Sequence, residues 1–172
     1  VFAFSTENWN RSSKEVSEIM NLLKIYLIKK VPELIAKGAS IKFIGDRSSF
    51  DKKTIALLEK AENLLPEKEK IKLIVALSYG GRDEIVRASN KLARAGKKIT
   101  EESIRESLDT KNIPDPDLII RTGGEMRISN FLLWQSAYSE LFFTKTLWPD
   151  FSKKELTKII GEYTKRERRN GK

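Results

Sequence analysis

The residues best suited to bind an anion lie between Arg121 and Ser129, where two arginines flank a pair of glycines. Guanidinium groups present paired donors that fit phosphate oxygens, and adjacent glycines allow backbone N–H groups to converge on an anion. Each charge-assisted hydrogen bond contributes roughly 1.5–3 kcal/mol. Arg121, Arg127 and Ser129 are therefore predicted to hold a diphosphate, with Glu125 orienting one guanidinium. The alternative is an ordinary loop with an ion pair on the surface.

A second polar cluster, Ser5 to Arg11, combines hydroxyls, a carboxylate, an amide, an indole and a guanidinium. A hydroxyl or an amide can position a substrate proton or a diphosphate oxygen. The indole of Trp9 can pack against an apolar chain. The alternative is a loop that leads into a helix, with Trp9 simply part of the core.

A third cluster, Tyr79-Gly80-Gly81-Arg82, lies where a strand meets the start of a helix. Backbone N–H groups at the start of a helix attract anions. A tight turn in which the glycines supply positive φ is the alternative interpretation.

Glu140 lies in an apolar setting, between Tyr138 and Leu141. A carboxylate in such surroundings needs a cationic partner. The sequence leaves two partners open, a metal ion or an arginine in a buried pair.

Composition narrows the chemistry further. With no Cys and no His, the chain contains no thiolate nucleophile, no zinc–thiolate site and no Ser-His-Asp triad. Any metal must be held mainly by carboxylates, which favours Mg²⁺. The excess of 33 Lys+Arg over 24 Asp+Glu gives a formal charge of +9. This charge suits partners that carry phosphate, although a solvated, lysine-rich surface would look the same.

No segment predicts a membrane span or a targeting signal. The longest uninterrupted apolar run, Leu73 to Leu77, is far shorter than the roughly 20 residues that a span requires. No signal or transit pattern opens the chain. We therefore expect a cytoplasmic protein.

The elements that must position these clusters follow from hydrophobic periodicity. Strands are predicted at 1–4, 41–44, 71–77, 117–121 and 141–144, and helices near 13–37, 51–65, 82–95, 100–108 and from 152. The alternation predicts an α/β fold, a single domain over 1–172 with a central, mainly parallel sheet flanked by helices. Ligands bind at the carboxyl ends of parallel strands. All three polar clusters follow such ends, so the sequence predicts one site.

These stretches resemble the cis-prenyltransferases, most closely the bacterial undecaprenyl diphosphate synthases. The matching segments are Phe4–Trp9, Tyr79–Arg82, Pro116–Glu125, Arg127–Gln135, Tyr138–Leu141 and Leu147–Phe151. They occur in the family's order and extend over nearly the whole chain. The resemblance implies an enzyme that adds isopentenyl diphosphate to farnesyl diphosphate in cis geometry, with Mg²⁺, as a homodimer.

The resemblance also implies a role for each site residue. Asn8 corresponds to the asparagine assigned to proton removal, and Glu140 to a glutamate associated with the metal. Because a neutral amide is a poor base, we expect Asn8 to orient groups while a phosphate oxygen or water accepts the proton. The substrate-binding residues would be Ser5, Thr6, Glu7, Trp9, Arg11, Arg121, Arg127, Ile128 and Ser129. The predicted wall of a tunnel for the growing chain is a helix face with Ile19, Leu22, Leu23 and Tyr26.

Two features depart from the family pattern. The Asp-Gly-Asn-Gly-Arg-Trp motif, whose aspartate binds Mg²⁺, would precede Val1, so we expect an N-terminal segment to be missing and residues 1–172 alone to be inactive. Ser78 also stands where the family usually has Asn, which affects local hydrogen bonds.

Three other functions remain open from the sequence. The first is a non-catalytic member of the family that partners an active subunit, although the presence of Arg121, Arg127, Ser129 and Glu140 argues against it. The second is a nucleic-acid-binding domain, which the scattered lysines disfavour; no nucleic acid is predicted as a partner. The third is a membrane-surface protein that uses the basic tail from Lys165 to Lys172. For an enzyme, the related expectation is a transient contact with the membrane surface during product release.

Overall fold

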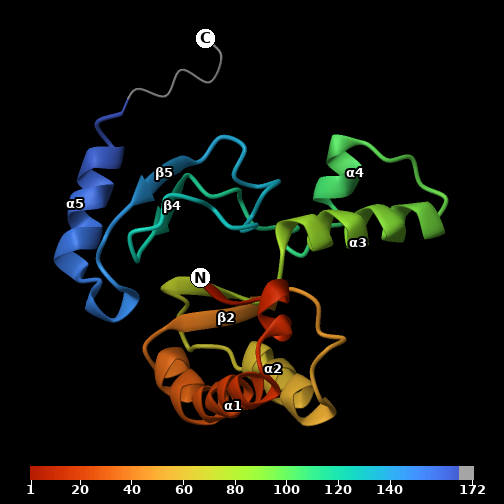
Figure 1. The fold of residues 1–172 in the computed structure, drawn as a ribbon, viewed down its shortest axis with the longest axis horizontal. Coiled ribbons are helices and arrows are strands. Elements are labelled where there is room, and N and C mark those ends of the chain that lie inside the picture. Colours follow the sequence, from red (N-terminus) through yellow and green to blue (C-terminus); the bar gives the residue numbers. More distant parts are fainter. Residues whose placement is uncertain (167–172) are drawn as a thin grey trace. The chain divides into compact units, whose positions relative to one another are not determined.

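The computed structural model describes residues 1–166, which fall into two compact units (Figure 1). The first unit is Val1–Lys111 and the second begins at Asn112. Most of the basic tail predicted at Lys165 to Lys172 lies outside the described residues. Each unit is described by itself below.

The first unit is built on a parallel sheet of three strands in the order β1-β3-β2. Its elements are β1 (Phe2–Ser5), the 3-10 helix η1 (Thr6–Asn10), α1 (Ser13–Ala36), β2 (Ala39–Ile44), α2 (Lys52–Asn63), β3 (Ile71–Tyr79), α3 (Gly81–Arg94) and α4 (Glu101–Arg105). The register pairs Ser5 with Tyr79 and Ile44 with Ala76. Because all three strands run the same way, their carboxyl ends share one edge of the sheet.

A hydrophobic cluster lies where α1 and α2 cover the sheet (Figure 1). Its buried members are Phe4, Leu27, Val31, Ile41, Phe43, Phe50, Leu58, Ala61 and Leu77. Burying a large apolar side chain contributes about 1.5–3 kcal/mol. Every strand of the sheet supplies at least one member, so the cluster fixes the strand ends against both helices.

Local sequence signals set the helix boundaries. The side chains of Ser12, Asp51, Thr100 and Ser152 each accept a backbone N–H from the first turn of the helix that follows. Gly38 follows α1 with a φ of 97°, a conformation that glycine adopts at little cost. These helix starts and this stop agree with the sequence predictions.

The second unit contains a parallel pair of strands, β4 (Leu118–Arg121) and β5 (Glu140–Phe143). The 3-10 helix η2 (Trp148–Asp150) and α5 (Lys153–Tyr163) follow. The register places Leu118 opposite Glu140 and Arg121 opposite Phe143. The N–H of Thr144 donates to the carbonyl of Arg121 at 2.9 Å. The backbone of Arg121, the last residue of β4, is therefore fixed by a hydrogen bond to the residue after β5.

The predicted α/β class, with parallel strands flanked by helices, is confirmed. The strands lie in two sheets, one in each unit. Among residues 1–166, no helix is both long and apolar enough to cross a membrane.

The cap of α2 predicts a pH dependence of stability. The hydrogen bond from Lys24 and the N–H of Thr54 lower the pKa of Asp51 from 3.8 to about 2. A carboxyl with a lowered pKa in the folded protein stabilises it above pH 4, and this contribution is lost as the pH falls from about 4 to 2. Asp51→Asn should therefore lose less stability over that window than the wild type. Urea unfolding midpoints measured from pH 6 to pH 2 would show the difference.

The matched control is Glu59→Gln, which removes an exposed carboxylate from the same helix without touching its cap. This control should follow the wild-type pH profile. Identical profiles for Asp51→Asn and the wild type would contradict the assignment.

Candidate active site

The arginine cluster of the second unit forms a small hydrogen-bonded loop. A guanidinium N–H of Arg121 donates to the hydroxyl of Ser129 at 2.7 Å and to the backbone carbonyl of Arg127. The guanidinium of Arg127 pairs with Glu125, with both side chains more than half exposed. Glu125 thus contacts one guanidinium, in an exposed ion pair that the alternative of an ordinary surface loop also predicts. Arg121 and Ser129 are in direct contact, and the backbone of Arg127 lies beside them.

The predicted anion nest at Gly123-Gly124 is wrong. The N–H of Gly123 donates to the carbonyl of Thr146 at 2.9 Å, and the N–H of Gly124 donates to the carbonyl of Thr144 at 2.8 Å. Both donors are thus used to bind the segment after β5. The glycines are needed for their backbone conformation, with φ values of 91° and 83°. These two glycines therefore do not offer their N–H groups to an anion.

The loop stores backbone strain next to the arginines. Ser129 and Leu132 have φ values of 46° and 47°, in the left-handed region that side-chain-bearing residues avoid. Such a conformation costs of order 1–3 kcal/mol per residue and is concentrated at functional sites. Ile128, predicted to contact substrate, is half-buried just before this strained segment.

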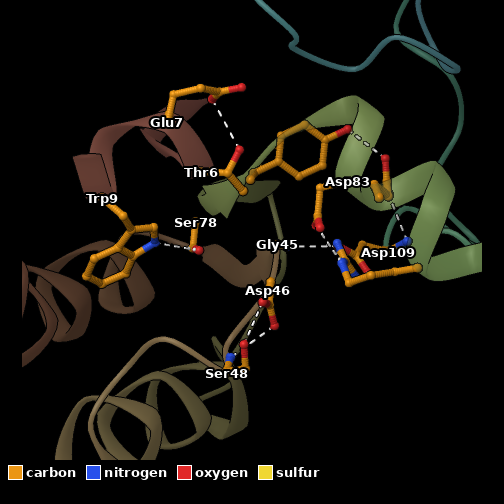
Figure 2. A network of polar contacts seen from close by, with 12 residues as sticks. Thr6, Glu7, Trp9, Gly45, Asp46, Ser48, Ser78, Asp83 and Asp109 are labelled. Atoms are coloured by element: carbon orange, nitrogen blue, oxygen red, sulfur yellow. Dashed lines mark hydrogen bonds and ion pairs between the residues drawn. The ribbon is translucent and has the colours of Figure 1, made fainter. Parts of the chain in front are cut away.

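In the first unit, η1 carries the predicted residues Thr6, Glu7 and Asn8 at the end of β1. The amide oxygen of Asn8 accepts the N–H of Ser5 at 2.9 Å. The hydroxyl of Thr6 donates to Glu7 at 3.2 Å (Figure 2). The amide oxygen of Asn8 is therefore engaged by the backbone of Ser5, at the end of β1.

Arg11 follows η1 and forms an ion pair with Glu15, one turn into α1. Both side chains are about half exposed, at 50% and 45%. An exposed pair of this kind contributes little to stability, so Arg11 can exchange Glu15 for another anion at small cost.

Trp9 contacts both the hydrophobic cluster and the carboxyl end of β3. Its ring makes edge-to-face contacts with Phe4 and Phe50, at centroid distances of 5.0 Å and 5.5 Å. Its indole N–H donates to the hydroxyl of Ser78 at 2.9 Å (Figure 2). The alternative that Trp9 packs on the core is therefore confirmed for part of the ring, while its polar edge is held by β3.

The turn after β3 does not obtain its positive φ from glycine. Gly80 has a φ of −152°, and the residue in the left-handed region is Ser78, with a φ of 49°. The interpretation of glycines at positive φ in this turn is therefore wrong. The first turn of α3 also carries Asp83 and Glu84, which oppose an anion at that helix start.

A polar network that the sequence predictions missed joins β2, α3 and the segment after α4. The carboxylate of Asp109 accepts both terminal nitrogens of Arg87, at 2.9 Å and 2.7 Å, and the N–H of Gly45 at 3.0 Å (Figure 2). Arg87 also pairs with Asp83 at 2.7 Å. Glu84, 1% exposed, accepts the N–H of Asp109 at 2.9 Å. Only the spacing of Asp83 and Arg87, one turn apart, is visible in the sequence.

The network shifts the pKa of Arg87. The pKa of Arg87 is raised above its ordinary value, chiefly by the hydrogen bonds to Asp109 and despite partial burial. Tyr79, fully buried, donates its hydroxyl to Glu84 at 2.6 Å. The network therefore anchors the end of β3 and the start of α3.

Glu140 is paired with an arginine. Its carboxylate contacts Arg166, whose guanidinium also lies 4.1 Å from the centre of the Phe142 ring. Among residues 1–166, no three acidic side chains converge as a metal centre. Mg²⁺ is often held by one or two carboxylates together with substrate phosphates. Glu140, 28% exposed, is a carboxylate of the type that Mg²⁺ accepts, and its partner here is Arg166, the second of the two partners that the sequence left open.

The predicted tunnel wall on α1 divides into two parts. Ile19 and Leu23 pack against the hydrophobic cluster, whereas Leu22 and Tyr26 are each 53% exposed. Ile25, 50% exposed, extends this apolar strip. The strip is the part of the predicted wall that is accessible to an apolar chain.

Solved structures with this fold are prenyl diphosphate synthases. A crystal structure from Campylobacter jejuni, described as a probable undecaprenyl diphosphate synthase, has a TM-score of 0.91 and 37% identity, covering 99% of this chain and 81% of that one. The lavandulyl diphosphate synthase of Lavandula x intermedia, solved with dimethylallyl diphosphate, has a TM-score of 0.91 and 36% identity, with 99% and 77% covered. The fold, shared with these enzymes at 36–37% identity, therefore defines a prenyltransferase.

Sequence relatives specify the family. Residues 1–171 match the family model of the undecaprenyl diphosphate synthases. The isoprenyl transferase of Agrobacterium fabrum is 45% identical over 178 residues, which are 99% of this chain and 72% of that protein. That of Aquifex pyrophilus is 45% identical over 173 residues, with 100% and 75% covered. The chain belongs to the undecaprenyl diphosphate synthase family, whose members are cis-prenyl chain-elongating enzymes of isoprenoid biosynthesis.

The Asp109 network predicts a stability defect. Asp109→Asn should lower the free energy of unfolding by roughly 1.5–3 kcal/mol, because a half-buried guanidinium loses its charged partner. Denaturant midpoints of variant and wild type measure the loss. Asp83→Asn is the matched control, since it removes the more exposed of the two partners of Arg87, and it should cost less. Equal losses would show that Asp109 is not the main anchor.

Proposed function

We propose that this protein adds isopentenyl diphosphate units in cis to farnesyl diphosphate, and so makes a long-chain polyprenyl diphosphate. Undecaprenyl diphosphate, the precursor of a lipid carrier for cell-wall synthesis, is the proposed product. The observation that carries this proposal is the contact between Arg121 and Ser129, with Arg127 and its partner Glu125 on the same loop. Membership of the family indicates the class of reaction, and the loop with Arg121, Arg127 and Ser129 is the proposed binding site of a diphosphate.

The arginine loop can bind the isopentenyl diphosphate through its side chains. Arg121 already donates to the Ser129 hydroxyl, which leaves further guanidinium N–H groups for phosphate oxygens. Arg127 is exposed, and among residues 1–166 its guanidinium is paired with Glu125 alone, in a pair that water already screens. A diphosphate carries more negative charge than one carboxylate, so it can draw Arg127 away from Glu125. Ile128 would contact the carbon part of the same substrate.

The allylic diphosphate must leave with its charge compensated. In the first unit, the residues proposed to line the site around the two substrates are Ser5, at the end of β1, and Thr6, Glu7, Trp9 and Arg11 after it. Arg11 can exchange Glu15 for a phosphate oxygen. In the second unit, Glu140 is the proposed ligand of Mg²⁺, which when bound would compensate the negative charge of a diphosphate.

Carbon–carbon bond formation then requires proton removal. The double bond of isopentenyl diphosphate attacks the allylic carbon, the carbon–oxygen bond to the diphosphate breaks, and one proton is lost from the new chain. Asn8 would orient the reacting groups through its amide N–H, since its oxygen already accepts from Ser5. A phosphate oxygen or water accepts the proton.

The growing chain needs an apolar surface. Each added five-carbon unit that is buried contributes on the order of 3–4 kcal/mol. The exposed strip with Leu22, Ile25 and Tyr26 on α1 is the proposed surface, continued by Ile19 and Leu23. Long products should therefore leave slowly, with a transient contact at the membrane surface during release. We also propose that the protein is a homodimer and acts in the cytoplasm.

Incorporation of labelled isopentenyl diphosphate by the full-length protein tests the function. Arg127→Ala should weaken binding of isopentenyl diphosphate by about 10- to 100-fold, the equivalent of one charge-assisted hydrogen bond. Binding of farnesyl diphosphate should change far less. Calorimetric titration with each diphosphate measures both affinities.

The control for this variant is Lys154→Ala, which removes an exposed cation from α5 in the same unit. It should leave both affinities at wild-type values. If Arg127→Ala weakens the binding of both diphosphates equally, Arg127 does not belong to the binding site of isopentenyl diphosphate.

The tunnel assignment predicts product length. Leu22→Trp should shorten the product, because a larger side chain on the apolar strip occupies space that the chain would fill. Chromatography of the labelled products measures their length. Lys60→Trp is the control, since it adds the same bulk at an exposed position of α2, outside the strip. Products of unchanged length from Leu22→Trp would remove this helix face from the tunnel.

A further inference from the structure

Ser78 combines burial with a strained backbone at the carboxyl end of β3. It is 1% exposed and has a φ of 49°. A non-glycine residue in the left-handed region costs of order 1–3 kcal/mol and persists only where its surroundings enforce it. The neighbouring Gly80 has an extended φ of −152°, so the strain is confined to a residue that carries a hydroxyl.

Two hydrogen bonds connect this residue to two other segments. The Ser78 hydroxyl accepts the indole N–H of Trp9 at 2.9 Å (Figure 2). The Ser78 carbonyl accepts the N–H of Asp46 at 3.0 Å. At Gly45, a Cβ would lie 2.0 Å from the carbonyl oxygen of Leu77, so the loop after β2 passes directly over this strand end. Ser78 therefore joins η1 and the β2 loop to β3.

Trp9 is the anchor of η1. The 3-10 helix is only five residues long, too short to hold its own orientation through backbone hydrogen bonds. The edge-to-face contacts with Phe4 and Phe50 confine the indole plane. The hydrogen bond to Ser78 selects the edge of the indole that faces β3. The orientation of η1, with Glu7 and Asn8, then follows from that of Trp9.

We infer that Ser78 is a positioning residue for the transfer reaction, acting through Trp9 on the residues of η1. The inference rests on the proposed function for its effect on turnover, but the contact between Ser78 and Trp9 can be tested without it. Loss of the hydroxyl leaves the indole N–H without its acceptor. The indole can then rotate, and the η1 residues lose their alignment with the reacting groups.

Kinetics of the full-length protein provide the first test. Ser78→Ala and Ser78→Gly both remove the hydroxyl, while only glycine relieves the strain at positive φ. Both variants should lower kcat by about 10- to 100-fold, the usual effect of a small misalignment. The KM for isopentenyl diphosphate should stay within about threefold, since Arg121 and Arg127 have their own contacts with Ser129 and Glu125. A glycine variant with wild-type turnover would overturn the inference, as would a loss confined to KM.

A double-mutant cycle separates this role from a general loss of stability. Trp9→Phe removes the indole donor while keeping an aromatic ring. Adding Ser78→Gly to Trp9→Phe should lower kcat by less than about threefold further, because the hydrogen bond is already gone. An undiminished further loss in the double variant would show that Ser78 acts independently of Trp9.

Nuclear magnetic resonance of the indole N–H groups supplies the readout that does not depend on activity. The chain has three tryptophans, and Trp9→Phe identifies the resonance of Trp9. In Ser78→Gly, exchange of this proton with solvent should accelerate by about 10-fold, and unchanged exchange would overturn the inference. If the wild-type protein fails to incorporate isopentenyl diphosphate, the proposed function fails, while the exchange rate still decides whether Ser78 holds Trp9.

Discussion

Backbone groups at the carboxyl end of a parallel strand lose their ladder partners, and buried polar groups need replacements. At the end of β3 the replacements come from outside the sheet: the N–H of Asp46 reaches the Ser78 carbonyl at 3.0 Å. The N–H of Gly45, at the end of β2, finds the Asp109 carboxylate at 3.0 Å. Satisfying these groups brings the loop after β2 and the segment after α4 to the carboxyl edge of this sheet. The polar residues at this edge are placed by that requirement as well as by the hydrophobic cluster.

In the second unit, two arginines remain exposed although each guanidinium already has a hydrogen-bonding partner. Arg121 is braced by Ser129 and a backbone carbonyl, and Arg127 by an exposed carboxylate. Guanidinium groups remain charged throughout the physiological pH range. In a chain without histidine, the diphosphate site proposed at this loop therefore relies on guanidinium groups alone for its positive charge.

The two solved relatives show how little the fold alone says about the product. One is described as a probable undecaprenyl diphosphate synthase and the other as a lavandulyl diphosphate synthase, yet both have a TM-score of 0.91 with this chain. Differences between such enzymes must lie in side chains placed on a common backbone. On this chain, the apolar strip of α1 and the hydrogen bonds that orient η1 are features of that kind.

The sequence alone determined the features that depend on neighbours along the chain. Helix starts at Ser12, Asp51, Thr100 and Ser152, the parallel strands and the pairing of Glu125 with Arg127 all follow from local periodicity, capping and short-range charge. The family motifs identified the class of enzyme for the same reason, since each is a short continuous stretch.

Only the tertiary structure decided which hydrogen-bonding groups remain available. Two adjacent glycines permit an anion nest, but residues after β5 occupy the N–H groups of Gly123 and Gly124. Positive φ falls on Ser78 rather than on the glycines that follow it, because Trp9 and Asp46 bind there from distant segments. Asp109 and Arg87 are 22 residues apart in sequence and form a bidentate pair. Such partners are set by how the chain folds back on itself, which no local pattern encodes.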